Sequence, residues 1–390
     1  MKKLLILLFT AFNFYSVSAQ QYLAVAREKD LFGYIDEKGN WAIQPVYEDA
    51  ETFSEGLARV RVKDLWGFID SKGKLVIEPA FTKVKNFTNG SAGACKNNVW
   101  GIIDKSGKWL IEPKYNNADG FISGWARVKV GDLWSYIDKN GNLIKSGPFR
   151  RAEPFMEGMA RISIKEKWSF IDSLGNIITK EEFVNVGDFS DGFAWVRPKE
   201  KVGYINKSGK PITEAKYDII KEFNEGLGRG FIEKTGWEYV DANGKTVIAL
   251  DKNIDNASKF SEGLALIKAD DRIGYINEKG AIVIKPQFGI GKDFRFGVAP
   301  VRKSGGKYFL INTKGEEISA NKFEKLNMCD NKLLRAMSEG KYGYVDIKGN
   351  WVVKPMFRNL EFFVDVNEIY NSKKYRNATN PFFFESTDFR

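Results

Sequence analysis

Apolar and polar residues alternate with a period of two along short stretches of the chain. In residues 57–63, for example, Ala58, Val60 and Val62 share one face, and basic residues occupy the other. This period is typical of a half-buried β-strand, because successive side chains of a strand point to opposite faces. No stretch combines helical spacing over more than two turns with helix caps. The pattern therefore predicts an all-β fold.

The strands follow one another as a meander. After the first strand, a second is predicted at Trp66–Asp70 and a third at Lys74–Glu78. A hairpin at Asp70–Gly73 joins them, because Asp accepts a backbone hydrogen bond two residues on and Gly supplies a positive φ. Pro79 then removes an N–H donor, which suits a strand end or an exposed edge. The residues that follow would form a short fourth strand.

This meander is repeated ten times along the chain. Its clearest marker is an aromatic residue, Gly, an aromatic or apolar residue, Ile, and Asp or Asn, followed by Gly three residues later. The copies begin at Phe32, Trp66, Trp100, Trp134, Trp168, Val202, Trp237, Ile273, Tyr308 and Tyr342. They are 34 residues apart through the sixth copy and 34 to 36 apart afterwards. Phe-x-x-Gly, as at Phe53–Gly56, and apolar-x-Pro, as at Ile43–Pro45, keep the same phase.

One position of the repeat is occupied by a small residue in nine of the ten copies. It is occupied by Ala24, Ala58, Ala92, Ala126, Ala160, Ala194, Gly228, Ala265 and Ala299, and the tenth copy has Leu334. We expect another backbone to pass close to these residues. Inner strands crowding the axis of a propeller, or contacts between the coils of a solenoid, would both meet this expectation.

These units resemble WG repeats, named for the Trp-Gly pair found here at Trp66-Gly67 and Trp100-Gly101. The resemblance covers roughly residues 22–363. It implies a bacterial β-rich repeat protein, often exported and without assigned biochemistry, with propeller-like blades and no catalytic residues to transfer. The chain departs from the pair by replacing the Gly or the aromatic residue, at Ser135, Ser169, Val202, Glu238, Ile273 and Phe309. Such drift suits a structural role for the pair.

We therefore predict that residues 20–363 form about ten propeller-like blades of three or four strands each, with a β-solenoid as the alternative. Ten blades would make one wide ring, and two rings or an open array also fit the sequence. The looser spacing after Phe223 would place a division near residue 226. Residues 364–390 leave the repeat phase and are expected to form a cap over the last unit or a sorting or docking tail.

Residues 1–19 have the pattern of a secretory signal peptide. Two lysines follow Met1, Leu4–Phe12 is apolar, and small residues precede a cleavage point between Ala19 and Gln20. The apolar run is shorter than the roughly 20 residues of a membrane-spanning helix, and no later segment is apolar enough to cross a bilayer. Gln20 replaces the Cys that bacterial lipidation requires. We expect an exported protein in the periplasm, on the outer surface or outside the cell, with no nucleic acid partner.

Composition excludes several chemistries. The 390 residues include no His, which rules out Ser-His-Asp and Cys-His nucleophilic sites and His-ligated zinc. Cys95 and Cys329 cannot form a four-thiolate metal site and are expected to be isolated small hydrophobic residues. No Walker-type or Rossmann-type glycine motif is present. We therefore assign no catalytic, cofactor-binding or metal-ligating residue and no cofactor. The net charge of +10 comes from scattered basic residues.

Phased Asp and Asn residues form the most regular polar set. They are Asp36, Asp70, Asp104, Asp138, Asp172, Asn206, Asp241, Asn277, Asn312 and Asp346. A carboxylate ladder could bind calcium or supply a glycosidase acid–base pair. However, Gly follows each residue three positions later, and Asn replaces Asp in three copies, which suits a turn and impairs a general acid. We predict turn formation for this set.

Two other sets share one phase each. Core packing is predicted for Trp66, Trp100, Trp134 and Trp168, with an exposed platform for sugar rings or cations as the alternative. Greater exposure is expected for Trp41, Trp109 and Trp351, which follow the hairpins. A solvated face is predicted for Arg59, Arg127, Arg161, Arg229 and Arg335, with a groove for anionic ligands as the alternative.

Together these features indicate an exported, non-enzymatic scaffold that binds a protein or another ligand. One alternative is a cell-envelope glycan-binding module that uses exposed tryptophans. The other is a hydrolase, which would need an Asp/Glu pair about 5–10 Å apart in a deep pocket. The partner, an unknown protein or an envelope glycan, and the oligomeric state are left open by the sequence.

Overall fold

The computed structural model describes residues 20–179, 183–319 and 321–368. Every regular element within these ranges is a β-strand, and none is a helix. The all-β prediction is therefore confirmed. The predicted signal peptide, residues 1–19, lies outside the described residues.

The second unit shows how one repeat folds. It consists of β4 (Asp49–Ala50), β5 (Ala58–Val62), β6 (Leu65–Ile69) and β7 (Leu75–Phe81), hydrogen-bonded in that order as an antiparallel sheet. This is the predicted meander of three or four strands. The last strand extends beyond its predicted end and passes through Pro79. Because β7 is the edge of the sheet, the missing N–H of the proline leaves no ladder partner unsatisfied.

The other sheets repeat this arrangement, and we number the blades in chain order. Blade 1 contains β1 (Tyr22–Glu28), β2 (Leu31–Ile35) and β3 (Trp41–Tyr47), and blade 2 is β4–β7. Blade 3 contains β8 (Lys83–Val84), β9 (Ser91–Lys96), β10 (Val99–Asp104) and β11 (Trp109–Tyr115). Blade 4 contains β12 (Asn117–Ile122), β13 (Trp125–Val130) and β14 (Leu133–Ile137). Blade 5 contains β15 (Arg151–Ala152), β16 (Met159–Ile164) and β17 (Lys167–Asp172), and blade 6 contains β18 (Asn185–Val186), β19 (Phe193–Arg197) and β20 (Gly203–Asn206).

The remaining blades are numbered in the same way. Blade 7 contains β21 (Ile219–Asn224), β22 (Leu227–Ile232), β23 (Gly236–Val240) and β24 (Thr246–Ala249). Blade 8 contains β25 (Ile254–Ser261), β26 (Leu264–Ala269), β27 (Arg272–Asn277) and β28 (Ile282–Phe288). Blade 9 contains β29 (Ile290–Gly291), β30 (Val298–Arg302) and β31 (Tyr308–Asn312). Blade 10 contains β32 (Lys325–Met328), β33 (Leu334–Ser338), β34 (Lys341–Val345) and β35 (Trp351–Phe357).

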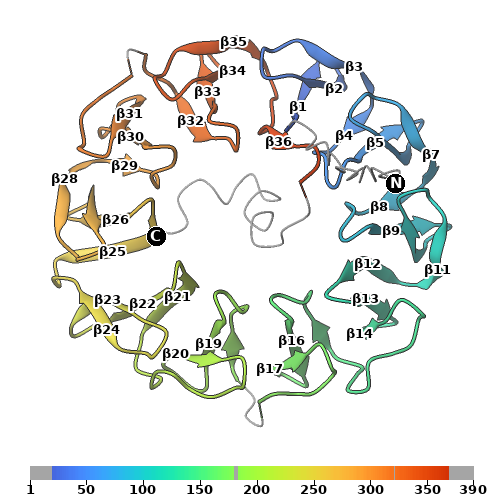
Figure 1. Cartoon of the computed structure of the whole chain (residues 1–390), viewed down its shortest axis with the longest axis horizontal. Coiled ribbons are helices and arrows are strands. Elements are labelled where there is room, and N and C mark those ends of the chain that lie inside the picture. The colour runs from blue at the N-terminus through green and yellow to red at the C-terminus, as the bar shows by residue number, and fades with distance from the viewer. Residues whose placement is uncertain (1–19, 180–182, 320, 369–390) are drawn as a thin grey trace, which may run out of the picture.

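The ten sheets stand around a single ring, with the first strand of each blade toward the centre and the last strand on the outside (Figure 1). The propeller prediction is confirmed. The solenoid, the open array and the pair of rings are ruled out by this arrangement.

The ring is closed by the end of the chain. β36 (Val364–Asp365) pairs with β1 through Leu23↔Val364 and Tyr22↔Asp365, and so becomes the first strand of blade 1. The stretch from Val364, which the sequence separates from the repeats, thus begins inside the first blade. Residues 369–390 of the predicted cap or tail lie outside the described residues. Closure covers the inner edge of β1, which an open array would leave exposed.

Aromatic rings fill the space between neighbouring blades. Tyr34 of blade 1 lies 4.9 Å from Phe53 of blade 2, measured between ring centroids, and both side chains are fully buried. Equivalent pairs include Phe68–Phe87, Tyr136–Phe155, Phe170–Phe189, Tyr204–Phe223, Tyr239–Phe260, Tyr275–Phe294 and Tyr344–Phe363. Each pair buries a large apolar area at a blade junction, which is the main source of stabilisation expected there.

These ring pairs explain the small position of the repeat. Ala58 has no solvent exposure and belongs to the same core cluster as Tyr34 and Phe53. At Gly228 an added Cβ would collide with the ring of Phe223 and lie 2.8 Å from the ring of Tyr204. The expectation of a closely passing backbone is therefore wrong for this position. Two aromatic side chains, one from each blade, occupy the space.

The glycine of the Trp-Gly pair is explained by a bulge in the outer strand. A Cβ on Gly33 would lie 2.5 Å from the carbonyl oxygen of Ile43 and 2.7 Å from the nitrogen of Pro45. The register between β2 and β3 shifts at this point. All five copies with apolar-x-Pro keep the glycine, namely Gly33, Gly67, Gly101, Gly274 and Gly343. Four of the five copies without it carry Ser135, Ser169, Glu238 or Phe309 instead. The pair thus has the structural role that its drift suggested.

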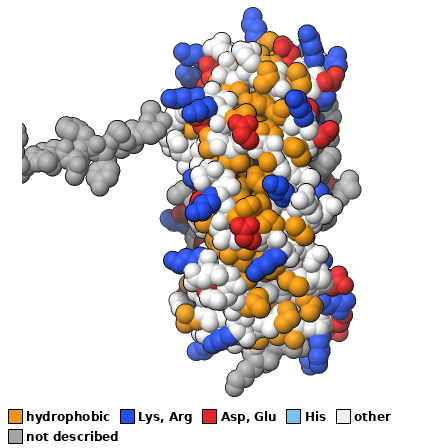
Figure 2. Space-filling model, turned by 90° about the vertical axis from the view of Figure 1, so that its right-hand side faces the viewer, with side chains coloured by type: hydrophobic (Ala, Val, Ile, Leu, Met, Phe, Trp, Pro, Cys, Tyr) orange, Lys and Arg blue, Asp and Glu red, His pale blue; other side chains and the backbone are white. Residues whose placement is uncertain are grey.

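The outer strands form the rim of the ring. Viewed from the side, hydrophobic side chains run along the middle of the rim, and charged side chains lie among them and toward both faces (Figure 2). Val46, Val76 and Leu110, from β3, β7 and β11, are exposed there. Prolines 45, 79 and 113 stand in the same strands and remove hydrogen-bond donors from the open edge, which opposes edge-to-edge pairing.

Candidate functional site: the turn face

In blades 2 to 9, two turns lie at the same end of the sheet. In blade 2, Ala58 is opposite Ile69, so the turns at Ser54–Leu57 and Asp70–Gly73 project from one face of the ring. We call this face, formed by these two turns and their counterparts in the other blades, the turn face. It carries the most strictly repeated polar residues of the chain, and we therefore consider it the candidate site.

The phased Asp and Asn residues build the outer of these turns. The Oδ1 atom of Asp70 accepts hydrogen bonds from the backbone N–H groups of Lys72 and Lys74, both at 2.9 Å. The same pair of bonds is present in all ten copies. Turn formation is confirmed, and the ladder of catalytic or calcium-binding carboxylates is not supported.

Hydrogen bonds keep several of these carboxyl groups ionised. The side-chain amide of Asn142 and nearby backbone N–H groups lower the pKa of Asp138. The hydroxyl of Ser106 and two backbone N–H groups lower the pKa of Asp104 in the same way, against a smaller effect of burial. A lowered pKa suits an anionic turn residue and is opposite to what a general acid at neutral pH needs.

The inner turn of blades 2 to 9 uses left-handed backbone at two successive residues. Glu55 and Gly56 have φ values of +54° and +87°, as a type I′ hairpin turn requires. The residue before the glycine is not glycine in blades 2 to 9 and still adopts positive φ, at Glu55, Asn89, Ser123, Glu157, Asp191, Glu225, Glu262 and Phe296. This conformation costs energy for a residue with a side chain, so compensating contacts are expected.

Glutamates supply those contacts at three blade junctions, and Asp191 accepts from the N–H of Gly226 at a fourth. Glu55 accepts hydrogen bonds from the backbone N–H groups of Asn89 at 2.6 Å and Gly90 at 2.8 Å, which belong to the inner turn of the next blade. The bonds from Asp191 and Gly192 to Glu157, and from Phe296 and Gly297 to Glu262, are equivalent. Each oxygen of the carboxylate thus binds one N–H, as in other charge-assisted bidentate pairs. Sequence reasoning missed these bridges, although a glutamate before the glycine marks all three.

The phased arginines also cross from blade to blade. Arg59 in β5 donates a 2.6 Å hydrogen bond to the carbonyl of Val84, in the first strand of the next blade. Arg127, Arg161, Arg229 and Arg335 donate in the same way to the carbonyls of Ala152, Val186, Ala257 and Leu360. Both sequence interpretations, a solvated face and a groove for anions, are therefore wrong. Burial lowers the pKa of Arg59, and Glu51 opposes this effect.

The tryptophans are half-buried and covered by cations. Arg59 lies 5.6 Å from the ring centre of Trp66, and Arg127 lies 4.5 Å from that of Trp134. Lys85 and Arg161 cover Trp100 and Trp168. All four tryptophans pack against core clusters, which agrees with the predicted core role.

The second set of tryptophans, for which greater exposure was expected, is not freely exposed either. Trp41, Trp109 and Trp351 are also half-buried. Their rings pack edge-on against Phe357, Phe81 and Phe323 of the preceding blades. They therefore extend the contacts between blades rather than standing free in solvent.

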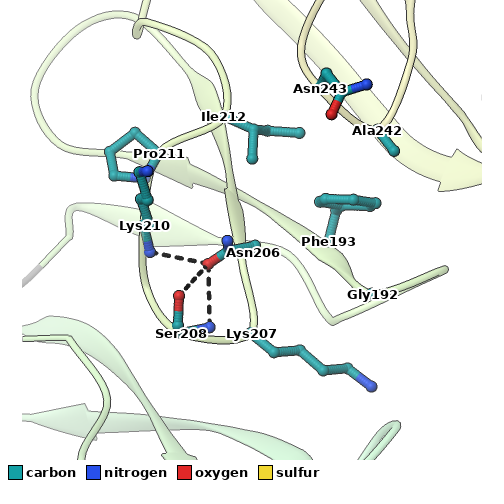
Figure 3. Close-up of a pocket in the computed structure, with 10 residues that line it drawn as sticks. All are labelled: Gly192, Phe193, Asn206, Lys207, Ser208, Lys210, Pro211, Ile212, Ala242 and Asn243. Atoms are coloured by element: carbon teal, nitrogen blue, oxygen red, sulfur yellow. Dashed lines mark hydrogen bonds between the residues drawn. The ribbon is translucent and has the colours of Figure 1, made fainter.

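A pocket of about 640 Å³ opens on the turn face between blades 6 and 7 (Figure 3). Phe193, Pro211 and Ile212 provide apolar walls, and Lys207 and Asn243 are among the polar lining residues. The fourth strand of blade 6 is reduced here to isolated bridges, such as Ile205↔Pro211. No Asp or Glu lines this pocket, so it does not offer the carboxylate pair that a glycosidase needs.

Cys95 and Cys329 are free and buried, as isolated small hydrophobic residues should be. Burial raises the pKa of the Cys329 thiol to about 12. Across residues 20–179, 183–319 and 321–368, no group of Cys, Asp and Glu residues is arranged to hold a metal ion. The same ranges contain no helix that is long and apolar enough to span a membrane.

Fold and turn face together define a ten-bladed β-propeller built from one repeated meander. The model of the WG containing repeat family matches residues 32–66, 66–100, 100–134, 134–168, 168–201, 203–229, 239–272, 273–308 and 342–367. The chain therefore belongs to the WG containing repeat family, as the resemblance predicted. The copy between residues 308 and 342 is not matched, and in it Phe309 replaces the glycine of the pair.

Solved structures with a similar fold include a eukaryotic initiation factor. It is 13% identical in sequence, has a TM-score of 0.51, and the alignment covers 90% of this chain and 98% of that chain. BamB from Moraxella catarrhalis is 13% identical with a TM-score of 0.31, covering 82% of this chain and 89% of that chain. At this identity the likeness to the initiation factor concerns the fold alone. No curated protein matches the chain significantly.

Proposed function

We propose that this protein is an exported, non-enzymatic scaffold that binds another protein through its turn face. One observation carries the proposal: the polar residues that recur at one phase of the repeat serve the ring itself. The phased Asp and Asn residues form turns, and the phased arginines join blades. The result is a rigid ring that offers many similar exposed turns, an arrangement that suits binding more than catalysis.

Three further observations support the separate parts of the proposal. The pattern of residues 1–19 supports export. The absence of His from the sequence and of carboxylates from the pocket lining supports a non-enzymatic role. The net charge of +10 favours a partner with an acidic surface, because complementary charge speeds association.

Site-specific photo-crosslinking tests the proposal in cells that produce the full chain. The crosslinker is placed at Lys72, on the turn face, and at Asp64, in the turn between β5 and β6 on the opposite face. Both residues are exposed, so they form a matched pair. We expect a discrete protein adduct from Lys72 and none from Asp64. Equal adducts from both positions, or none from the turn face, would contradict the proposal.

Export needs its own test. Fractionation followed by mass spectrometry should detect the chain outside the cytoplasm, beginning at Gln20. An intact N-terminus in the cytoplasmic fraction would overturn this part of the proposal.

The two alternatives have less support. A glycan-binding module would need free aromatic faces, and the phased tryptophans are half-buried under cations. A hydrolase would need a carboxylate pair in a pocket, which the pocket between blades 6 and 7 does not provide. Specific retention on a glycan array, or hydrolysis of an envelope polymer, would favour the corresponding alternative.

A further inference from the structure

Two blade junctions on the turn face bind a carboxylate with the same three groups. Between blades 2 and 3, Glu55 accepts from the N–H groups of Asn89 and Gly90, and the Nζ atom of Lys105 lies 3.4 Å from its Oε2 atom. Between blades 5 and 6, Glu157 is held by the corresponding groups of Asp191, Gly192 and Lys207, the lysine again at 3.4 Å. The chain itself thus shows which ligand this arrangement takes.

The junction between blades 3 and 4 has these donors without the carboxylate. Ser123 and Gly124 occupy the turn, with φ values of +51° and +85°, and Lys139 stands at the position of Lys105 and Lys207. Asn89 replaces the glutamate. Within the described ranges, the backbone N–H groups of Ser123 and Gly124 have no hydrogen-bond partner and Lys139 has no ion pair. All three residues are exposed.

Asn89 does not take over the role of the glutamate. Its Nδ2 atom donates a 3.3 Å hydrogen bond to the carbonyl of Phe121, at the end of the first strand of blade 4. Its side chain therefore acts as a donor, and the pair of turn N–H groups is left for an external acceptor. The next junction differs again, because Ser173 follows Asp172 where a lysine stands in the other three.

We propose that the turn of Ser123 and Gly124, with Lys139, is a binding site for a carboxylate, and that its occupant is an Asp or Glu side chain of a protein partner. Two adjacent N–H groups match the two oxygens of a carboxylate, and the ammonium group adds opposite charge. Binding of a carboxylate follows from the local geometry alone. The identification of the occupant as a protein side chain rests on the proposed function.

NMR titration of the full chain, labelled with ¹⁵N at glycine, tests the site directly. Acetate should shift the Gly124 amide resonance in a saturable manner, whereas acetamide at equal concentration should not. The Gly90 resonance should stay in place, because Glu55 already occupies its turn. Absence of a response at Gly124, or an equal response to acetamide, would overturn the site.

Two substitutions provide matched controls. Asn89→Glu adds the carboxylate present at the two occupied junctions and should abolish the acetate response of Gly124. Glu55→Asn removes that carboxylate beside Lys105 and should make Gly90 respond. Both variants reproduce residues that the repeat already uses at this position, and their melting curves check that the ring is intact. An unchanged Gly124 response in Asn89→Glu would count against the site.

The occupant is tested with a neutral-ended peptide and with the partner. Acetyl-Ala-Glu-Ala-amide should shift Gly124, and its Gln analogue should not. With the crosslinker at Lys72, Asn89→Glu should reduce the yield of the partner adduct. If the adduct is unchanged while Gly124 still binds acetate in the parent chain, the partner assignment is wrong, although the proposed function and the carboxylate site both stand.

Discussion

The backbone N–H of Gly56 donates a 2.6 Å hydrogen bond to the carbonyl of Val366, which ties the inner turn of blade 2 to the C-terminal segment. The N–H of Glu55 bonds to the carbonyl of Glu368 at 3.0 Å in the same way. At the junctions described above, a glutamate of the preceding blade fills this role. Blade 1 has no such turn, because its first strand comes from the other end of the chain. Backbone carbonyls therefore replace the carboxylate where the ring closes.

Removing residues 364–390 should open the ring. The truncation deletes β36 and the buried side chains of Val364 and Val366 and exposes the inner edge of β1. Loss of two buried valines alone should cost about 3 kcal/mol, and the open edge should promote association. Thermal unfolding and size-exclusion chromatography measure both effects. Truncation of residues 369–390, which keeps β36, is the control and should give the higher melting temperature of the two truncated chains; equal stability of the two would contradict the role of β36.

Replacing Arg127 should loosen the junction between blades 4 and 5. Arg127 donates to Asp119 at 2.6 Å and to the carbonyl of Ala152 at 2.7 Å, and it lies over the ring of Trp134. Arg127→Ala leaves a mostly buried carboxylate short of one partner, so we expect a loss of about 2–4 kcal/mol in the free energy of unfolding. Chemical denaturation measures it.

An exposed arginine provides the matched control. Arg150 pairs with Glu166 at the surface, with 57% and 77% of the two side chains exposed. Arg150→Ala should change stability by less than about 1 kcal/mol, because surface ion pairs contribute little. Similar losses for both substitutions would show that Arg127 acts only as a surface charge.

The glycine of the Trp-Gly pair should tolerate a side chain only where the outer strand lacks apolar-x-Pro. In blade 2, a Cβ on Gly67 would lie 2.5 Å from the carbonyl oxygen of Ile77, so Gly67→Ala should cost about 1–3 kcal/mol through overpacking. In blade 4 the chain already carries Ser135, and Ser135→Ala should be nearly neutral. Denaturation midpoints compare the two. A neutral Gly67→Ala would show that the bulge yields without cost.

The sequence predicts most of the fold, because its periodicities report local geometry. The alternation of apolar and polar residues predicts the strands. The Asp or Asn three residues before each hairpin glycine predicts turns that appear in every copy. The position of Arg59 in the repeat, however, does not predict its hydrogen-bond acceptor, because the carbonyl of Val84 belongs to another blade. The closing strand was missed because Val364 lies outside the repeat phase. One sign of it was available: Phe363 follows Tyr344 at the same separation as Phe53 follows Tyr34, and both pairs form ring contacts.

Acid should weaken the outer turns of the ring. The carboxyl groups of Asp104 and Asp138 determine the sign of this change in stability with pH. The pKa of each lies below its usual value of 3.8 in the folded protein, through hydrogen bonds from Ser106 and Asn142 and from backbone N–H groups. Their contribution is thus complete above the pKa of the unfolded chain. As the pH falls below about 4, the unfolded chain takes up protons first, and the contribution is lost until the folded pKa is passed.

Replacing both residues with Asn should reduce the loss of folding stability at low pH. Asn206 already forms the same turn, with its Oδ1 atom accepting from the N–H groups of Ser208 and Lys210, so the double variant Asp104→Asn, Asp138→Asn should keep the fold. Urea denaturation at pH 7 and at pH 3 measures the effect. We expect a smaller drop in the free energy of unfolding between these two pH values than in the parent chain. An identical drop would mean that other carboxylates, such as Asp119 beside Arg127 and Lys85, carry the acid sensitivity instead.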